Sequence, residues 1–214
     1  MISAHEALER LRQGNQRFAA DARSPQELAN TRRRAELAGG QEPFAAILGC
    51  SDSRVPVEIV FDQSLGDLFV IRVAGNIVAP SQIGSVEFAA ERYGTRLVVV
   101  LGHSSCGVIQ ATIEQLRRTT VSESPHVSSI INRVRPIVQG LLETDVSHDP
   151  EALVRQAVRA NVRASADHLR HGSQVIESLI ESEGLLVVGA EYSLETGVVD
   201  FFDGALQEAS DGPE

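Results

Sequence analysis

The chain has 214 residues, of which 43% are hydrophobic and 22% are charged, a composition typical of soluble globular proteins. Its formal net charge of −10 argues against nucleic acid or an anionic membrane as a partner, because both select basic surfaces. No apolar run could span a bilayer, and the polar N-terminal segment does not resemble a signal peptide. We therefore expect a cytoplasmic protein whose two cysteines remain free thiols.

Residues 1–40 are predicted to form an N-terminal helical arm. Leu8, Leu11 and Phe18 recur on one helical stripe, and Ser24 begins a capping-box pattern for a second helix. The apolar stripe is narrow and the charges are many. These helices are therefore expected to cover another surface, such as that of a partner subunit, rather than to build a core of their own.

Apolar runs typical of buried strands alternate with helical patterns in the rest of the chain. The strands are expected within residues 44–51, 67–76, 96–107 and 185–193, with a short fifth at 197–204 that turns back as a hairpin. The helices are expected at 82–94, 108–118 and 128–143, and from 150 onward with a break at Gly172. This alternation predicts an α/β fold with a central, mostly parallel sheet of about four parallel strands plus a short antiparallel edge strand, flanked by helices. Residues 1–214 are predicted to form a single domain.

A thiol and an imidazole end two of the predicted parallel strands. Cys50 ends the first strand, His103 ends the third, and Cys106 lies just beyond it. Ligands bind at the carboxyl ends of strands in open α/β sheets, so the three side chains would meet if the two strands are neighbours. Two thiolates and one imidazole suit zinc, and three protein ligands leave the open fourth position of catalytic zinc sites. The alternative is that both cysteines are small buried core residues.

Asp52 and Arg54 follow closely after Cys50. Asp52 is near enough either to occupy the fourth zinc position or to hydrogen-bond its occupant. A bidentate pair with Arg54 would hold the carboxylate off the metal and keep it ionised. Without that pair, the carboxylate could bind zinc and close the site. The competing interpretation is structural, with Arg54 capping a turn and Asp52 capping the next helix.

The motifs CSDSR at 50–54 and HSSCG at 103–107 resemble those of the β-class carbonic anhydrases. This resemblance implies an enzyme with one zinc ion per subunit that reversibly hydrates carbon dioxide to bicarbonate and a proton. It implies Cys50, His103 and Cys106 as the zinc ligands. Asp52 and Arg54 would form the catalytic pair that orients a zinc-bound hydroxide, with Asp52 on zinc only in a closed state. The resemblance also implies a homodimer, or a dimer of dimers, in which the arms embrace neighbouring subunits.

The same resemblance implies a set of residues around the substrate. The amide of Gln41 would contact substrate or bicarbonate, and Phe69 would line an apolar carbon dioxide pocket. Gly107 would bring a backbone N–H close to the metal thiolate. Two residues depart from the family pattern, because Phe88 stands where a tyrosine is frequent and Ala74 where a valine is common. The pocket is therefore expected to lack one hydroxyl and to be slightly wider.

An inhibitory bicarbonate site of some bacterial members is not expected here in its usual form. That site is built around a tryptophan, whereas this chain has Ile47 at the corresponding position and no tryptophan at all. Arg72 and Val55 match other positions linked with that regulation.

Two other functions use the same residues. Relatives on this scaffold hydrolyse carbonyl sulfide or carbon disulfide, and pocket width would separate them from carbon dioxide hydrases. A non-catalytic zinc or bicarbonate-sensing module would instead keep Asp52 on the metal at every pH. The presence of Arg54 beside Asp52 argues against that module, because a permanent metal ligand would not need such a partner.

Overall fold

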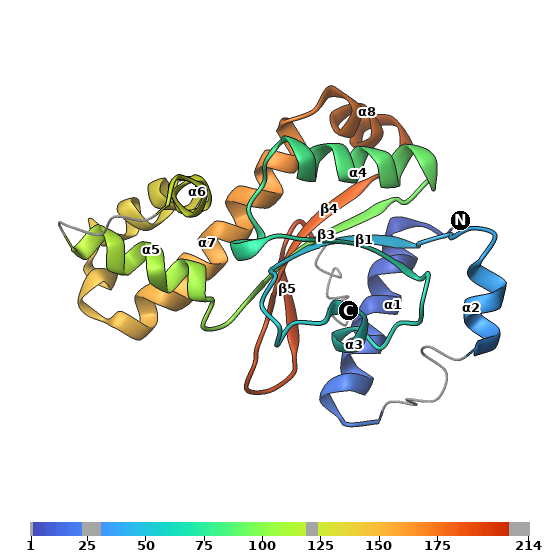
Figure 1. Ribbon diagram of the computed structural model, residues 1–214, viewed down its shortest axis with the longest axis horizontal. Helices are drawn as coiled ribbons and strands as arrows, with labels where there is room; N and C mark the ends of the chain where they lie inside the picture. The colour runs from blue at the N-terminus through green and yellow to red at the C-terminus, as the bar shows by residue number, and fades with distance from the viewer. Residues whose placement is uncertain (1, 23–30, 119–123, 206–214) are drawn as a thin grey trace, which may run out of the picture.

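In the computed structural model, which describes residues 2–22, 31–118 and 124–205, five strands form one sheet with helices on both faces (Figure 1). The strand order is β2-β1-β3-β4-β5. The first four strands are parallel, and β5 pairs antiparallel with β4. The strands are β1 Ala45–Gly49, β2 Leu68–Arg72, β3 Leu97–His103, β4 Leu186–Tyr192 and β5 Val199–Asp203. The predicted mostly parallel sheet with an antiparallel edge strand is confirmed.

The longer helices follow the predicted segments, whereas the short helix α3 and the two 3-10 turns were not predicted. They are α1 Ala4–Ala19, α2 Thr31–Leu37, α3 Val57–Val60, α4 Pro80–Arg92, α5 Gly107–Arg117, α6 Pro125–Leu142, α7 Pro150–His171 and α8 Gln174–Glu183, with short 3-10 turns η1 Ala74–Asn76 and η2 Asp145–His148. The break at Gly172 is confirmed. Helix α6 starts earlier than expected because the Ser124 hydroxyl accepts a hydrogen bond from the Val127 N–H and caps the helix there. The expected cap at Ser24 lies outside the described residues.

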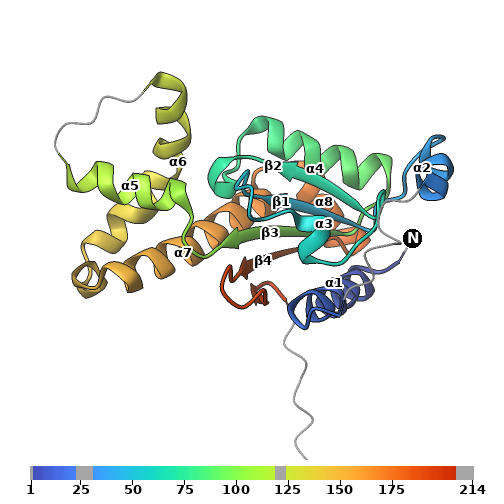
Figure 2. The ribbon, with the colours of Figure 1, turned by 60° about the horizontal axis from the view of Figure 1, so that its bottom comes forward.

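Helices cover both faces of the sheet (Figures 1 and 2), and buried apolar side chains form one layer on each face. Successive strand residues point to opposite faces, so Ile47 of β1 faces the layer that includes α1 and α3. Its neighbour Leu48 faces the layer that includes α4, α7 and α8. The central strands β1 and β3 are therefore buried on both faces along their whole length.

One expectation about the edge of the sheet needs correction. Strand β2 is not buried on both faces, because among the described residues it has a neighbouring strand on one side only; Phe69 and Val70 are half-buried and Arg72 is exposed.

Helix α1 covers another surface, as expected for the arm, and that surface is the sheet of this same chain, against which Leu8 and Leu11 are buried. Contact of residues 1–40 with a partner subunit stays a prediction.

A third apolar cluster lies beyond the end of the sheet at which β1 and β3 terminate. Helices α5 and α6 pack there against the first half of α7 (Figure 2). Cys50 and Cys106 belong to this cluster, so the two thiols are buried between the sheet edge and the helices. Among the described residues, no helix combines the length and apolar character needed to cross a bilayer.

Candidate metal centre

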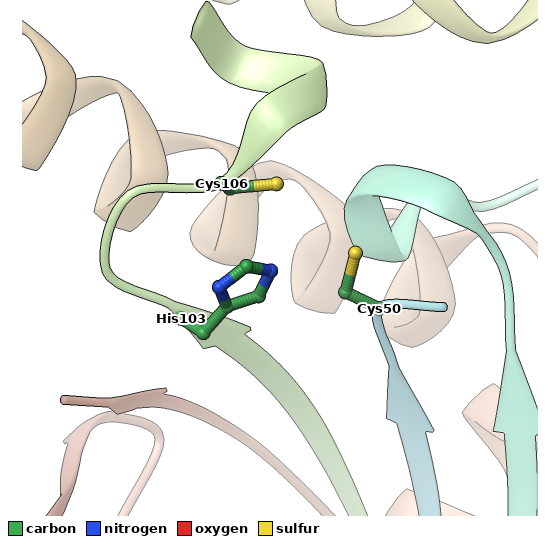
Figure 3. A group of neighbouring side chains, drawn as sticks. All are labelled: Cys50, His103 and Cys106. Carbon is green, nitrogen blue, oxygen red and sulfur yellow. The ribbon is translucent and has the colours of Figure 1, made fainter. Parts of the chain in front are cut away.

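The centre lies at the carboxyl edge of the sheet, where β1 and β3 end side by side. Gly49 is opposite Leu101 in the parallel register, so Cys50 emerges next to the end of β3, which closes on His103. Figure 3 shows Cys50, His103 and Cys106 directed into one common space. One ligand atom from each of these three side chains lies within 4.8 Å of the other two. The predicted convergence of two thiols and one imidazole is confirmed.

A tight turn after β3 returns Cys106 toward His103. Ser105 in this turn has a φ of 56°, the left-handed region that reverses the chain in a short distance. Cys106 then caps the N-terminus of α5. Its side chain makes no capping hydrogen bond, although the backbone N–H groups of Ile109 and Val108 act to lower the pKa of its thiol. Gly107 is the first residue of α5, and the approach of its N–H to the metal thiolate stays a prediction.

His103 presents one ring nitrogen to the centre. The ring is fully buried, and Nδ1 lies 2.9 Å from the carbonyl oxygen of Ser104, to which it donates in the neutral tautomer. Nε2 then carries a lone pair, yet it has no hydrogen-bond partner within the described part of the chain. A buried polar atom without a partner is costly, and a metal ion would satisfy it.

The two neighbouring thiols shift each other's pKa in opposite directions. The pKa of Cys50 is lowered chiefly by the Cys106 thiol; burial opposes this shift and the Gly75 N–H reinforces it. The Cys50 thiol and burial raise the pKa of Cys106. Metal binding requires both thiols to lose their protons. Two thiolates and an imidazole are the donor set of tetrahedral zinc sites with one open position, so these residues fit a zinc ion.

Asp52 and Arg54 form a bidentate pair beside the centre. Arg54 Nε and its terminal NH2 nitrogen lie 2.9 Å and 2.7 Å from the two carboxylate oxygens, and the Arg54 backbone N–H donates at 3.0 Å. Arg54 thereby holds the pKa of Asp52 well below its usual range, first through the side-chain hydrogen bonds. Asp52 is absent from the three-ligand cluster. In this structure the Asp52 carboxylate is paired with Arg54, which is the arrangement that holds Asp52 off the metal and leaves the fourth position open.

Three further hydrogen bonds that the sequence did not predict hold the loop after β1. Arg72 donates from Nε to the Cys50 carbonyl at 3.0 Å and from its NH2 nitrogen to the Asp52 carbonyl at 2.6 Å. The Gly75 N–H donates to the Cys50 sulfur at 3.3 Å. The dipeptide Gly75–Asn76 is a turn signal, and it could have marked a tight turn at this end of β2.

Comparison with known proteins decides the family. The carbonic anhydrase family model matches residues 45–199, which include all three candidate ligands. Carbonic anhydrase 2 of Mycobacterium tuberculosis is 37% identical over 187 residues, and the match covers 87% of each chain. The carbonic anhydrase of Mycolicibacterium smegmatis is 37% identical over 198 residues, covering 89% of each. The β-carbonic anhydrase CafA of Aspergillus fumigatus has a similar structure, with a TM-score of 0.71, 26% identity, and coverage of 91% of this chain and 89% of that one. The chain belongs to the β-carbonic anhydrase family.

In this β-carbonic anhydrase, only part of the expected substrate set lies at the chain's own metal centre. Ala74 does, because it immediately precedes Gly75, whose N–H contacts Cys50. Phe69 does not: it is paired with Ala46, so it lies about 13 Å back along the strand from Cys50.

Phe69 instead joins Phe88 and Tyr93 in an aromatic cluster on β2 and α4. The centroid of Phe69 lies 6.2 Å from that of Phe88 and 6.0 Å from that of Tyr93, and Phe88 is 51% exposed. Gln41 Nε2 donates to the Tyr93 hydroxyl at 3.0 Å. Tyr93 was not among the expected site residues, yet it places a phenol close to the position where Phe88 lacks one.

Proposed function

We propose that this protein catalyses the zinc-dependent reversible hydration of carbon dioxide to bicarbonate and a proton. The observation that carries the proposal is the buried Cys50–His103–Cys106 cluster, whose ring nitrogen Nε2 lacks a partner, with an arginine-held carboxylate beside it. Membership of the carbonic anhydrase family supports the same activity.

The proposed ligands to zinc are the sulfurs of Cys50 and Cys106 and Nε2 of His103. Bound zinc supplies a Lewis acid that makes hydroxide available near neutral pH. The three ligands are almost completely buried, at 4%, 2% and 0% exposed. Beside them the side chain of Asp52 is 16% exposed and that of Arg54 is 52% exposed, so we propose that the open zinc position faces this side.

Asp52 is the proposed catalytic acceptor. Because Arg54 keeps it ionised, its oxygens accept hydrogen bonds and donate none. Oδ2 lies 3.8 Å from His103 Nε2, close enough for Asp52 to accept a hydrogen bond from the attacking oxygen nucleophile. That bond would fix which lone pair faces carbon dioxide. Arg54 has a second function in this scheme, since it keeps the carboxylate from becoming a fourth ligand.

Carbon dioxide is apolar and needs an apolar pocket. Ala74 is the expected pocket residue that lies beside the chain's own centre, whereas Gln41, Phe69 and Phe88 lie away from it. We therefore propose a homodimer in which the aromatic cluster and Gln41 of one subunit complete the centre of its partner. The half-exposed Phe88 and the edge position of β2 support this arrangement, because both leave apolar or hydrogen-bonding surface uncovered.

Stopped-flow measurement of carbon dioxide hydration tests the activity. We expect the zinc-loaded chain to hydrate carbon dioxide at pH 8.5, and the variant Cys106→Ser to lose both zinc and activity. Sulfide release from carbonyl sulfide or carbon disulfide in place of hydration would favour the hydrolase alternative. A zinc-loaded chain that turns over none of these substrates would favour a sensing module.

A further inference from the structure

The turn that follows β2 contacts the metal centre through a single backbone donor. The Gly75 N–H donates to the Cys50 sulfur at 3.3 Å. Gly75 and Asn76 both have positive φ values, 72° and 42°. The left-handed conformation is free for glycine but costs energy for Asn76, because its Cβ crowds the backbone. A turn of this kind persists only where neighbouring groups hold it.

Helix α5 closes one side of this turn. A Cβ on Gly75 would lie 2.8 Å from Cγ1 of Val108, closer than real Cβ contacts allow. The turn is therefore packed tightly between the Cys50 sulfur and the first turn of α5, and it has little space in which to move toward α5.

Helix α7 holds the turn by its carbonyl groups. Asn161 Nδ2 donates to the Gly75 carbonyl at 2.8 Å, and Ser165 Oγ donates to the Asn76 carbonyl at 3.0 Å. The two residues are one helical turn apart, so both point from the same face of α7. They are 3% and 6% exposed, although polar side chains are seldom buried unless they are hydrogen-bonded. The consecutive carbonyls of Gly75 and Asn76 thus both accept hydrogen bonds from side chains of α7.

We propose that Asn161 is a positioning residue of the metal centre, holding the Gly75 turn so that its N–H stays on the Cys50 sulfur. The proposal rests on the proposed function in one respect, namely that Cys50 is a metal ligand. A hydrogen bond to a thiolate withdraws charge from the sulfur and fixes its direction. Groups that orient metal ligands from outside the ligand set commonly change metal affinity by about 10–100-fold. Ser165 supports the same turn by donating to the Asn76 carbonyl.

The test compares Asn161→Ala with a matched variant elsewhere in the chain. Asn15 is also a buried asparagine, 4% exposed, and it donates to the carbonyls of Val60 and Gly197, neither of which is a candidate ligand or part of the Gly75 turn. Zinc affinity is measured by competition with a chromophoric chelator, and the thiolate-to-cobalt charge-transfer band is recorded after Co²⁺ loading. We expect Asn161→Ala to weaken zinc binding about tenfold or more and to shift the cobalt band. Asn15→Ala should lower the melting temperature while leaving zinc affinity and the cobalt band unchanged.

A cobalt band and zinc affinity in Asn161→Ala that match wild type would overturn the proposal. So would an equal shift in Asn15→Ala, because general destabilisation would then explain it. If Asn161→Ala does not fold, Ser165→Ala decides by the same two measurements, with a smaller change expected in the same direction. Failure of the proposed function is seen separately: wild type that binds zinc through Cys50 without hydrating carbon dioxide would refute the activity and leave the role of Asn161 intact.

Discussion

Oδ2 of Asp52 lies 3.8 Å from Nε2 of His103, the ring nitrogen that faces the metal centre. The carboxylate is thus close to the ligand set, yet both of its oxygens are held by Arg54. Asp52 could act as a metal ligand or as a hydrogen-bond acceptor beside the metal. The Asp52–Arg54 pair therefore decides between these two functions.

Removal of Arg54 should separate metal binding from turnover. We expect Arg54→Ala to retain one zinc per chain and to lose about 10–100-fold in kcat/KM, because Asp52 is no longer held off the metal. The kcat/KM of Arg54→Lys should lie between those of wild type and Arg54→Ala, since lysine keeps the charge but cannot form the bidentate pair. Zinc content by elemental analysis and stopped-flow hydration check this. Wild-type activity in Arg54→Ala would contradict the proposed pair.

The Asp52–Arg54 pair should also appear in the pH dependence of stability. The pKa of Asp52 is lowered in the folded chain, so the pair contributes fully above the unfolded pKa of about 3.9 and loses its contribution as the pH falls toward the folded value. We expect Asp52→Asn to be less stable than wild type near pH 7, with the difference shrinking below about pH 4. Urea unfolding of both proteins, each freed of metal by chelator, measures it. A difference that grows on acidification would have the wrong sign.

Removal of zinc should lower the thermal stability of the protein. Metal that binds only the folded chain stabilises it by mass action, and its loss leaves His103 Nε2 buried without a partner. We expect the melting temperature to fall after treatment with a strong chelator and to recover when Zn²⁺ is restored. Cys50→Ser should show neither change. If chelator treatment leaves the melting temperature of wild type unchanged, the three side chains hold no metal.

The aromatic cluster offers a test of the proposed dimer. Phe88 on α4 is 51% exposed, and Val127 on α6 is comparably exposed at 46%. We expect Phe88→Glu to shift the chain toward monomer in light scattering and to reduce hydration at least about tenfold, because a charge in an apolar contact is strongly unfavourable. Val127→Glu should leave mass and activity unchanged. If Phe88→Glu keeps both the mass and the activity of wild type, the cluster does not complete a partner's centre.

Much of the sheet and the ligand set could be predicted because both follow from short local patterns. The apolar runs of β1 and β3 end at Cys50 and His103, and the edge at which parallel strands end is general. The half-burial of β2 could not be predicted, because strand order depends on pairing between distant segments. Contacts from Asn161 and Arg72 were missed for the same reason: each residue has an ordinary local sequence, and its partner is far along the chain.

The pairing of β1 with β3 also determines when the centre can form. β2 and α4 separate β1 from β3 in the sequence, so Cys50 and Cys106 approach one another only when these two distant strands pair. The turn beside Cys50 is held only after α7 has packed. Long-range pairing of this kind is slow, since loop-closure entropy opposes it before the contacts form. We therefore expect the three-residue cluster to form late in folding, after β1 and β3 have paired and α7 has packed.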